Sequence, residues 1–554
     1  MVLSILRNMG STIFFILKIV ISLYYSNKCI IFANRKLNKK NRIMNYSSYQ
    51  KDIFNEVVKG NTNIIINAVA GSGKTTTIVE CCKRLKCNEN DVKFLAFNKN
   101  IADELKTKLH GYADVSTMHA FGFSILKDVY NIPKYKRYVK VDNYRYRKYI
   151  KENIYSLSSL ISPDTPTNRV YGFISNVCTL LDLARVNLIQ HGNKDILRQI
   201  TDEYNINLLF DEIEVTDILL ADAYKMPKNQ VIDFTDMLIL PLFTCKKFIP
   251  TYKYVFIDEC QDLSKAQREL MLCAAQKGRF IAVGDRKQAI NGFAGADCLS
   301  FDKIAQMPNT IEMPLSVNYR CGKNMVKLAQ EIVPQIKAHD NAIEGEITHI
   351  NNIDKNTFKP NDMILCRTSA PLVGACMYLI EQGITAVVKG KDIAQELKNI
   401  VNNANTNDID GVLMHLNTLK EKCLKSIKNN IKCTDEQAKE STRYQTLCDR
   451  CKCIENICNY SIENTIELKY YIDKLFSDDH VKNAVILSTV HKAKGLEANR
   501  VAIFLPNKLP LTYKNQTKWQ FEQEMNLKYV ALTRAKKELI IVDMSEKDLL
   551  KLRK

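Results

Sequence analysis

The 554-residue sequence contains no internal repeat and no long low-complexity linker. These two absences exclude a solenoid of stacked repeats and a chain that is largely disordered. Hydrophobic residues make up 46% of the chain and charged residues 25%, which is typical of globular proteins. The chain is too long for one hydrophobic core, so we expect two to four domains.

Acidic residues are absent from the first 43 positions, which hold eight lysines and arginines. The apolar run from Ile13 to Tyr25 is short for a membrane span, and Lys18 interrupts it near its middle. Three interpretations of residues 1–43 stay open: a membrane anchor giving weak membrane association, an organelle-targeting segment, or a dispensable extension before a functional start at Met44.

The formal net charge is +19, of which +8 falls in this N-terminal segment and +11 on the rest of the chain. An excess of positive charge favours a polyanionic partner, and a nucleic acid is the first candidate.

The 18 cysteines favour reduced thiols in an intracellular compartment, the nucleus or the cytoplasm, over a disulfide framework. Four of them are clustered in a Cys-x-x-Cys context that raises the alternative of a zinc site: Cys448, Cys451, Cys453 and Cys458. The segment from Tyr444 to Phe476 has helical periodicity and lacks glycine and proline, so we expect buried helical thiols there.

A phosphate-binding loop is the first functional motif along the chain. The apolar run Ile64–Asn67 predicts a strand, and the residues after it match such a loop except that Ala68 replaces the first glycine. A helix is expected from Thr76. In these loops backbone N–H groups hold phosphates, the lysine reaches the β- and γ-phosphates, and the hydroxyl binds Mg²⁺. The predicted nucleotide-binding residues are Ala70, Gly71, Ser72, Gly73, Lys74, Thr75 and Thr76.

A pair of carboxylates, Asp258 and Glu259, follows a second predicted strand at Tyr254–Ile257. A carboxylate at the end of a strand can hold the Mg²⁺ that bridges the phosphates, and its neighbour can orient water for attack. We therefore predict that Thr75 and Asp258 bind Mg²⁺ and that the chain hydrolyses a nucleoside triphosphate.

Alternating strand and helix patterns place the chain in the α/β class, as two cores that each carry a mainly helical insertion. We predict a first domain over residues 44–310 with its insertion at about 127–231, and a second over 311–554 with its insertion at about 392–479. Besides the two strands above, the predicted strands are Phe94–Phe97, Phe280–Val283, Asp362–Arg367, Val485–Ser488, Val501–Phe504 and Leu539–Val542.

The ordered set of motifs from Gln50 to Ala535 resembles the UvrD/Rep group of superfamily 1 helicases, and within it the eukaryotic F-box DNA helicase branch. The resemblance implies two RecA-like P-loop NTPase domains with ATP and Mg²⁺ in the cleft between them. It also implies an ATP-dependent DNA helicase that translocates 3′→5′ on single-stranded DNA in replication, repair or recombination.

The resemblance also assigns roles around the nucleotide. Gln50 would read the adenine edge, Tyr319 would stack on adenine, and Glu497 would accept from the ribose hydroxyl. The implied catalytic residues are Glu259 as the base that activates water, Gln288 as the γ-phosphate sensor, and Arg320 and Arg534 as cations that reach the γ-phosphate from the second domain.

The DNA contacts implied by the resemblance lie at Phe97, Asn98, Thr117, His119, Phe293, Thr489 and His491. Aromatic rings suit a translocating enzyme because they stack on any base. Relatives often have Trp-Arg where this chain has Phe293 and Ala294, so one stacking surface is smaller and a cation is missing. The Lys- and Tyr-rich stretch from Lys134 to Lys151 is either a further DNA contact or a solvated basic helix face.

Single-stranded DNA and single-strand/duplex junctions are therefore the expected partners, and no obligate protein partner is evident. A translocase that strips proteins from DNA without efficient unwinding is one alternative, and an RNA-directed helicase is another, since stacking and backbone contacts discriminate sugars poorly. A nucleic-acid-binding scaffold without hydrolysis is a third, less compatible with the complete set of phosphate-handling residues.

Overall fold

The computed structural model describes residues 46–545 except 132–137, 205, 207, 291, 293–296, 298, 432–433, 461, 479–480 and 513–515, together with residue 548. Two compact units are present, Met1–Lys51 and Asp52–Lys554. The three interpretations of residues 1–43 fall outside the described residues. Within the described part, no helix is both long and apolar enough to cross a membrane.

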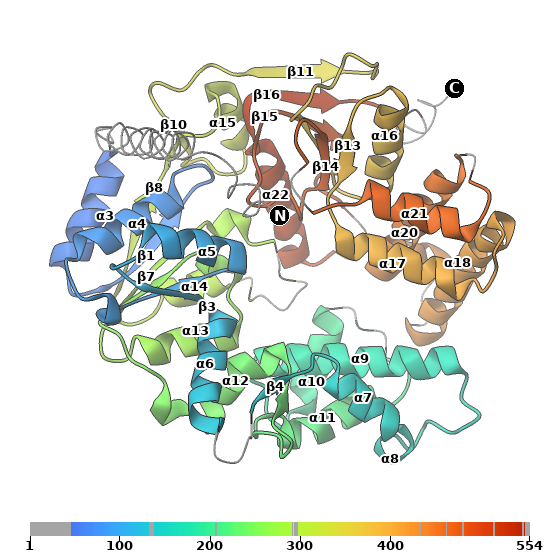
Figure 1. Cartoon of the computed structure of the whole chain (residues 1–554), viewed down its shortest axis with the longest axis horizontal. Coiled ribbons are helices and arrows are strands. Elements are labelled where there is room, and N and C mark those ends of the chain that lie inside the picture. The colour runs from blue at the N-terminus through green and yellow to red at the C-terminus, as the bar shows by residue number, and fades with distance from the viewer. Residues whose placement is uncertain are drawn as a thin grey trace, which may run out of the picture. The chain divides into compact units, whose positions relative to one another are not determined.

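The first sheet has six parallel strands in the order β3-β2-β6-β7-β1-β8. Every residue of β2 and β7 is buried, as expected for parallel strands covered by helices on both faces. The strands are β1 (Asn63–Ala68), β2 (Val92–Ala96), β3 (Asp114–Thr117), β6 (Tyr254–Ile257), β7 (Arg279–Gly284) and β8 (Thr310–Leu315). The helices between them (Figure 1) are α4 (Lys74–Arg84), α5 (Lys99–Lys108), α6 (Met118–Tyr130), α12 (Phe234–Thr244), α13 (Lys265–Ala274) and α14 (Ser300–Ala305).

Strand β8 pairs with β1 and forms one edge of the first sheet. It contains Pro314, which has no N–H to donate to a further strand and is therefore tolerated at an edge. The predicted domain boundary at residue 310 falls at the first residue of this strand, so the first sheet continues to Leu315.

The second sheet also has six parallel strands, in the order β11-β16-β15-β12-β14-β13. Its strands are β11 (Glu346–Ile350), β12 (Met363–Cys366), β13 (Ala386–Val388), β14 (Val485–Thr489), β15 (Ala498–Phe504) and β16 (Ala535–Val542). Its accompanying helices are α15 (Lys323–Ala329), α16 (Ala370–Glu381) and α22 (Lys518–Leu532). Two parallel α/β cores confirm the predicted fold class.

Two further groups of helices interrupt the cores (Figure 1). The first group comprises α7 (Arg145–Glu152), α8 (Ile154–Leu157), α9 (Thr167–Val186), α10 (Lys194–Glu203) and α11 (Glu212–Ala223), and a small parallel sheet of β4 (Lys140–Val141) and β5 (Val231–Ile232) flanks it. The second comprises α17 (Lys391–Asn403), α18 (Ile409–Ile431), α19 (Asp435–Glu440), α20 (Thr442–Cys458) and α21 (Thr465–Leu475).

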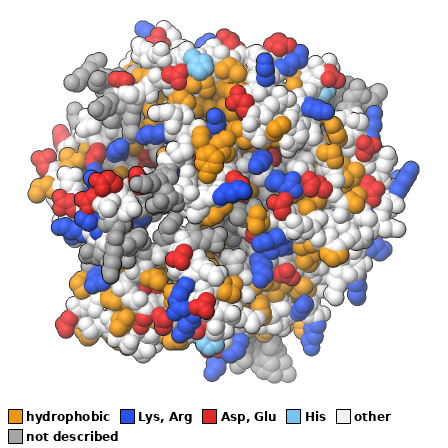
Figure 2. All heavy atoms as spheres, turned by 180° about the vertical axis from the view of Figure 1, so that it is seen from behind, with side chains coloured by type: hydrophobic (Ala, Val, Ile, Leu, Met, Phe, Trp, Pro, Cys, Tyr) orange, Lys and Arg blue, Asp and Glu red, His pale blue; other side chains and the backbone are white. Residues whose placement is uncertain are grey.

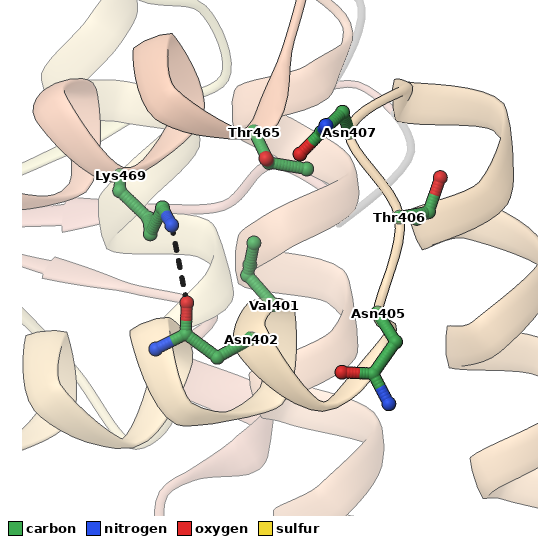
Figure 3. A pocket seen from close by; sticks show the side chains of 7 residues that line it. All are labelled: Val401, Asn402, Asn405, Thr406, Asn407, Thr465 and Lys469. Atoms are coloured by element: carbon green, nitrogen blue, oxygen red, sulfur yellow. Dashed lines mark hydrogen bonds between the residues drawn. The ribbon is translucent and has the colours of Figure 1, made fainter.

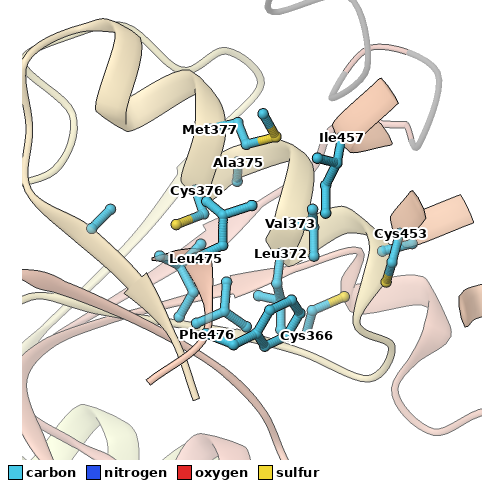
Figure 4. Packing of buried hydrophobic residues seen from close by; sticks show 14 of the residues in the cluster. Cys366, Leu372, Val373, Ala375, Cys376, Met377, Cys453, Ile457, Leu475 and Phe476 are labelled. Atoms are coloured by element: carbon cyan, nitrogen blue, oxygen red, sulfur yellow. The ribbon is translucent and has the colours of Figure 1, made fainter. Parts of the chain in front are cut away.

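The clustered cysteines lie on α20, which packs on α16. Cys451 and Cys453 are fully buried in the hydrophobic core beneath the second sheet, part of which is shown in Figure 4. Burial raises the pKa of Cys451 to about 11, so this thiol stays protonated at neutral pH. Among the described residues, no group of three or more histidine, cysteine or acidic side chains could hold a metal ion. Cys451 and Cys453 therefore act as core residues, while Cys448 and Cys458 are only partly buried.

A buried ion cluster joins α9 to the start of α12. Arg185 is fully buried and pairs with Asp233 at 2.8 Å and Asp236 at 3.0 Å. Burial disfavours a charged guanidinium, but the two carboxylates outweigh burial and raise the pKa of Arg185. Replacing it with methionine would leave both carboxylates without this partner.

We expect Arg185→Met to lower the free energy of unfolding by about 3–5 kcal/mol, measured by urea denaturation, because it breaks a buried ion pair. The control is Arg198→Met on α10, whose partner Asp195 is 90% exposed and whose loss should change stability little. Equal effects of the two variants would contradict a structural role of the cluster.

Candidate nucleotide and nucleic-acid site

The phosphate loop connects β1 to α4. Gly71 and Gly73 have φ angles of 67° and 81°, a left-handed conformation that favours glycine. Helix α4 begins at Lys74, so the prediction of a start at Thr76 was two residues late. Ser72 is fully buried, and its hydroxyl has no hydrogen-bond partner among the described residues. An unpaired buried hydroxyl inside a loop of this shape fits a site whose remaining polar partner is a ligand.

The second core contacts this loop directly. The backbone N–H of Ala70 donates to the Tyr529 hydroxyl at 2.8 Å, and the Asn318 side chain donates to the Ala70 carbonyl at 2.7 Å. The N–H of Tyr319 donates to the carbonyl of Gly71 at 2.9 Å. A Cβ atom on Gly71 would lie 2.7 Å from the Arg320 side chain, so glycine is also required for this close approach.

Three acidic residues follow strands of the first sheet: Asp258 and the partly buried Glu259 after β6, and Asp285 after β7; Asp258 and Asp285 are buried. The Lys74 ammonium lies 3.4 Å from the Glu259 carboxylate. Burial and the Glu259 charge raise the pKa of Asp258 to about 7. Burial alone would raise the pKa of Glu259, but the Lys74 and Lys494 charges lower it to about 2. Glu259 is therefore ionised at neutral pH, as a base that orients water must be.

Gln261 and Gln288 connect these carboxylates. Gln261 donates to Glu259 at 2.5 Å and accepts from the N–H of Asp285 at 3.1 Å. Gln288 donates to the Asp285 carboxylate at 2.9 Å, so its side chain is oriented within the network. The structure therefore groups Gln288, the predicted sensor, with the predicted base.

The carbonyls of three consecutive residues in the first core each accept a hydrogen bond from a side chain of the second core. We call this the three-carbonyl contact. Its pairs are Lys494 to Gln288 at 2.8 Å, Asn526 to Ala289 at 3.0 Å, and Gln523 to Ile290. Lys494 also pairs with the buried carboxylate of Asp262. The segment Gln288–Ile290, which carries the predicted sensor, thus belongs to the first core and is hydrogen-bonded to the second.

Both arginines predicted to reach the γ-phosphate belong to the second core. Arg320 pairs with Glu497 at 2.5 Å, and Lys536 pairs with the same carboxylate at 2.5 Å. Arg534 is 1% exposed, and burial together with the Arg320 charge lowers its pKa to about 10. It remains charged at neutral pH. The carboxylate of Glu497, the predicted ribose acceptor, forms ion pairs with both Arg320 and Lys536.

The donor set fits a magnesium nucleotide. Mg²⁺ prefers oxygen ligands and is commonly held by one or two carboxylates together with substrate phosphates and water. Asp258 supplies such a carboxylate beside the phosphate loop, and Thr75 lies in the first turn of α4. Since phosphate oxygens would complete the ligand set, the lack of a three-residue metal cluster among the described residues is compatible with this site. The ligand roles of Thr75 and Asp258 stay predictions.

Gln50 lies in α3 (Ser48–Lys59) and is 5% exposed. It accepts from the N–H of Ser47 at 3.0 Å, while the Ser47 hydroxyl accepts from the N–H of Gln50 at 3.3 Å. This reciprocal pair fixes the start of the helix. The role of Gln50 in reading adenine stays a prediction.

The predicted DNA contacts of the first core lie at the carboxyl ends of β2 and β3. Phe97 is 42% exposed, so its ring is available for stacking. Asn98 and Thr117 accept backbone hydrogen bonds that cap α5 and α6. The His119 ring meets Phe234 edge-on at 6.1 Å, and burial lowers its pKa. Phe293 lies outside the described residues.

Thr489 and His491 line a cavity of about 530 Å³ in the second core, which we call the second-core cavity. Arg367, Trp519 and Glu524 also line it. Burial and the Arg367 charge lower the pKa of His491 to about 3, so its imidazole is neutral. Both predicted DNA-contacting residues of the second core thus line the same cavity.

A smaller cavity of about 290 Å³ lies between the end of α17 and the start of α21. Lys469 donates there to the Asn402 side chain at 3.1 Å (Figure 3). None of its seven lining residues belongs to a predicted site. On the face shown in Figure 2, basic and acidic side chains lie interspersed. The net charge of +19 is therefore not gathered into a single basic patch on this face.

Several residues of the site were not assigned a role from sequence. Tyr529, Asn318 and Lys494 lie within motifs that were recognised, and position in the motif was the available signal. The roles of Asn526 and Gln523 could not be predicted from sequence. A polar residue on a helix usually faces solvent, and its contact with another core becomes visible only in the fold.

Family models match both halves of the chain. The UvrD/REP helicase N-terminal domain matches residues 49–309, and the UvrD-like helicase C-terminal domain matches residues 389–546. These two ranges contain the phosphate loop, the carboxylates and Arg534.

The chain is also similar to individual helicases. A probable DNA helicase II homolog of Mycoplasma pneumoniae is 25% identical, over 87% of this chain and 82% of that protein. F-box DNA helicase protein 1 of Schizosaccharomyces pombe is 22% identical, over 86% of this chain and 55% of that protein. The ATP-dependent DNA helicase PcrA of Leuconostoc citreum is 26% identical, over 49% of this chain and 37% of that protein. The chain thus spans about half the length, or less, of the latter two relatives. By its two matching domain models and its paired α/β cores, the chain belongs to the UvrD/Rep-type helicases of superfamily 1.

Proposed function

We propose that this protein is an ATP-dependent DNA helicase that moves 3′→5′ along single-stranded DNA during replication, repair or recombination. The observation that carries the proposal is the contact of the second core with the phosphate loop, through Tyr529, Asn318 and Tyr319. A site built from two cores couples events at the nucleotide to the relative position of the cores.

The chemistry assigned to this chain begins at Glu259. Its carboxylate, kept ionised by Lys74, orients a water molecule toward the γ-phosphate. Arg320 and Arg534 supply positive charge from the second core as negative charge spreads over the γ-phosphate oxygens. Asp258 and Thr75 would hold Mg²⁺, which would supply neutralisation of phosphate charge at this site.

The same contacts relate hydrolysis to movement along DNA. Gln288 senses the γ-phosphate, and its carbonyl is held by Lys494 of the second core. Lys494 follows His491 by three residues, and His491 lines the second-core cavity. Loss of the γ-phosphate is therefore expected to change the contacts of the second core with the strand.

Steady-state ATP hydrolysis by the full chain, with and without single-stranded DNA or RNA, tests this function. We expect strong stimulation by single-stranded DNA and displacement of a duplex that carries a 3′ single-stranded tail. The matched substrate with a 5′ tail should remain duplex. Stimulation without displacement would indicate a translocase, and stimulation by RNA alone would indicate an RNA-directed helicase.

A further inference from the structure

We infer that Lys536 is a positioning residue for ATP hydrolysis, which occupies one oxygen of the Glu497 carboxylate and thereby keeps Arg320 from pairing with both oxygens. This role rests on the proposed function and extends it to a lysine that follows Arg534 by two residues. Lys536 acts on the reaction through Glu497 and Arg320, the predicted ribose acceptor and one of the predicted γ-phosphate cations.

Adjacent segments of the second core bring these three side chains together. Strands β15 and β16 pair in parallel, Glu497 directly precedes β15, and Lys536 is the second residue of β16. The N–H of Gly322 donates to the carbonyl of Lys536 at 3.1 Å, which attaches the segment after Arg320 to the same strand. The backbone therefore fixes the place from which each side chain reaches the carboxylate.

Each oxygen of the Glu497 carboxylate pairs with a different cation. Nε of Arg320 lies 2.5 Å from Oε2, and Nζ of Lys536 lies 2.5 Å from Oε1. Nη1 of Arg320 donates to the carbonyl of Thr533 at 3.4 Å. No described residue accepts a hydrogen bond from Nη2 of this arginine. The guanidinium thus meets the carboxylate at one point, and Nη2 retains its capacity to donate to a phosphate oxygen.

Two other arginines of the second core form a two-point pair with a glutamate. Arg500 donates to Glu538 from Nε at 2.6 Å and from Nη2 at 3.3 Å, one nitrogen to each oxygen. Arg367 likewise uses Nε and Nη2 on Glu524. Among the described residues, no lysine pairs with either of these glutamates. Two-point pairing is a strong geometry for arginine and a carboxylate, and it forms here where no lysine shares the carboxylate.

A two-point pair at Glu497 would compete with the predicted role of Arg320 at the nucleotide. Arg320 lies against the phosphate loop, because a Cβ atom on Gly71 would be 2.7 Å from the Arg320 Cβ. With Nε and Nη2 both bound to the carboxylate, the guanidinium would have to break one more charge-assisted hydrogen bond to reach the γ-phosphate oxygens. Lys536 removes this cost by holding Oε1.

The shared carboxylate also keeps positive charge beside the phosphate loop. Partial burial raises the pKa of Glu497, but the bonds and charges of Lys536 and Arg320 outweigh it and hold the pKa below its usual value. The carboxylate is therefore ionised at neutral pH. Two cations on one carboxylate leave an excess of positive charge, whereas Arg320 and Glu497 alone would cancel. Such an excess favours anionic phosphates.

Lys536→Met tests this role in the full chain through steady-state ATP hydrolysis at saturating single-stranded DNA. We expect kcat to fall by roughly 10- to 150-fold, the contribution of one hydrogen bond between charged groups. KM for ATP should change only a few-fold, because the phosphate loop is unaltered. Since the Lys536 and Glu497 side chains are 39% and 37% exposed, the melting temperature should change little.

Lys537→Met is the matched control, because it removes the same charge from the next residue of β16, which is exposed. Its kcat should equal that of the unaltered protein. The conservative variant Lys536→Arg keeps a cation that can hold Oε1, and it should retain most of the activity.

A second comparison is made in a Glu497→Gln background. Glutamine has one carbonyl oxygen and cannot form the two-point pair, so adding Lys536→Met should cause no further loss of kcat. A general effect of the missing charge, or of a weakened fold, would persist in that background.

The possible failures are distinguishable. The positioning role would be rejected by an unchanged kcat in Lys536→Met, by a loss that Lys536→Arg shares, or by a loss that persists in the Glu497→Gln background. Each of these results would leave the proposed function standing. Absence of ATP hydrolysis by the unaltered full chain would reject both.

Discussion

Replacing Arg534 with alanine is expected to lower kcat for ATP hydrolysis by about 10³–10⁵ while ATP affinity changes only a few-fold. The guanidinium donates to the carbonyls of Val530 at 2.9 Å and Leu496 at 3.1 Å. These bonds hold the guanidinium in a defined position, as a preorganised cation requires. Single-turnover hydrolysis and binding of a fluorescent ATP analogue measure the two quantities.

The control for general damage is Arg500→Ala, which removes a partly buried arginine of the second core. Arg500 pairs with Asp362 at 2.5 Å and Glu538 at 2.6 Å and has no predicted nucleotide role. It should lower stability and leave kcat nearly unchanged. Unchanged turnover in the Arg534 variant would reject hydrolysis by two cooperating cores.

Replacing Lys74 with alanine is expected to reduce ATP turnover by at least about 10²–10³ and to leave DNA affinity largely intact. The variant loses the cation predicted to hold the β- and γ-phosphates. It also removes the charge 3.4 Å from Glu259 that lowers the pKa of this base. Turnover is measured at saturating single-stranded DNA, and DNA affinity by anisotropy.

Lys83→Ala on the same helix, α4, provides the matched control, because Lys83 lies in the last turn, away from the phosphate loop. Its turnover should equal that of the unaltered protein. If the Lys74 variant hydrolysed ATP at the normal rate, the phosphate loop would not be the catalytic nucleotide site.

Much of the fold could be predicted because parallel strands buried on both faces are continuous apolar runs. Tyr254–Ile257 was predicted with the bounds that the structure has, and β1 and β7 differ by one residue at each end. Strand β8 was missed because it is an edge strand with alternating exposure and a proline, so its apolar signal is weak. Its place beside β1 is a long-range property that no local pattern carries.

The candidate site likewise contains residues that could be predicted from sequence and residues that could not. The phosphate loop and the carboxylates were found because a short motif fixes their chemistry. The approach of Tyr529 to Ala70 joins residues 459 positions apart, and sequence spacing gives no information about such a pair. The second-core cavity was not foreseen either, because its lining comes from segments spread between Arg367 and Glu524.

The three-carbonyl contact has a consequence for how such an enzyme could be tuned by substitution. Its acceptors are backbone carbonyls of Gln288, Ala289 and Ile290, and every amino acid has this group. Side-chain replacements in the first core therefore leave the acceptors in place. The donors Lys494, Gln523 and Asn526 are open to mutation, so the strength of these three hydrogen bonds is encoded mainly in the C-terminal part of the chain. Asp262, which pairs with Lys494, is a first-core side chain that also bears on one of the donors.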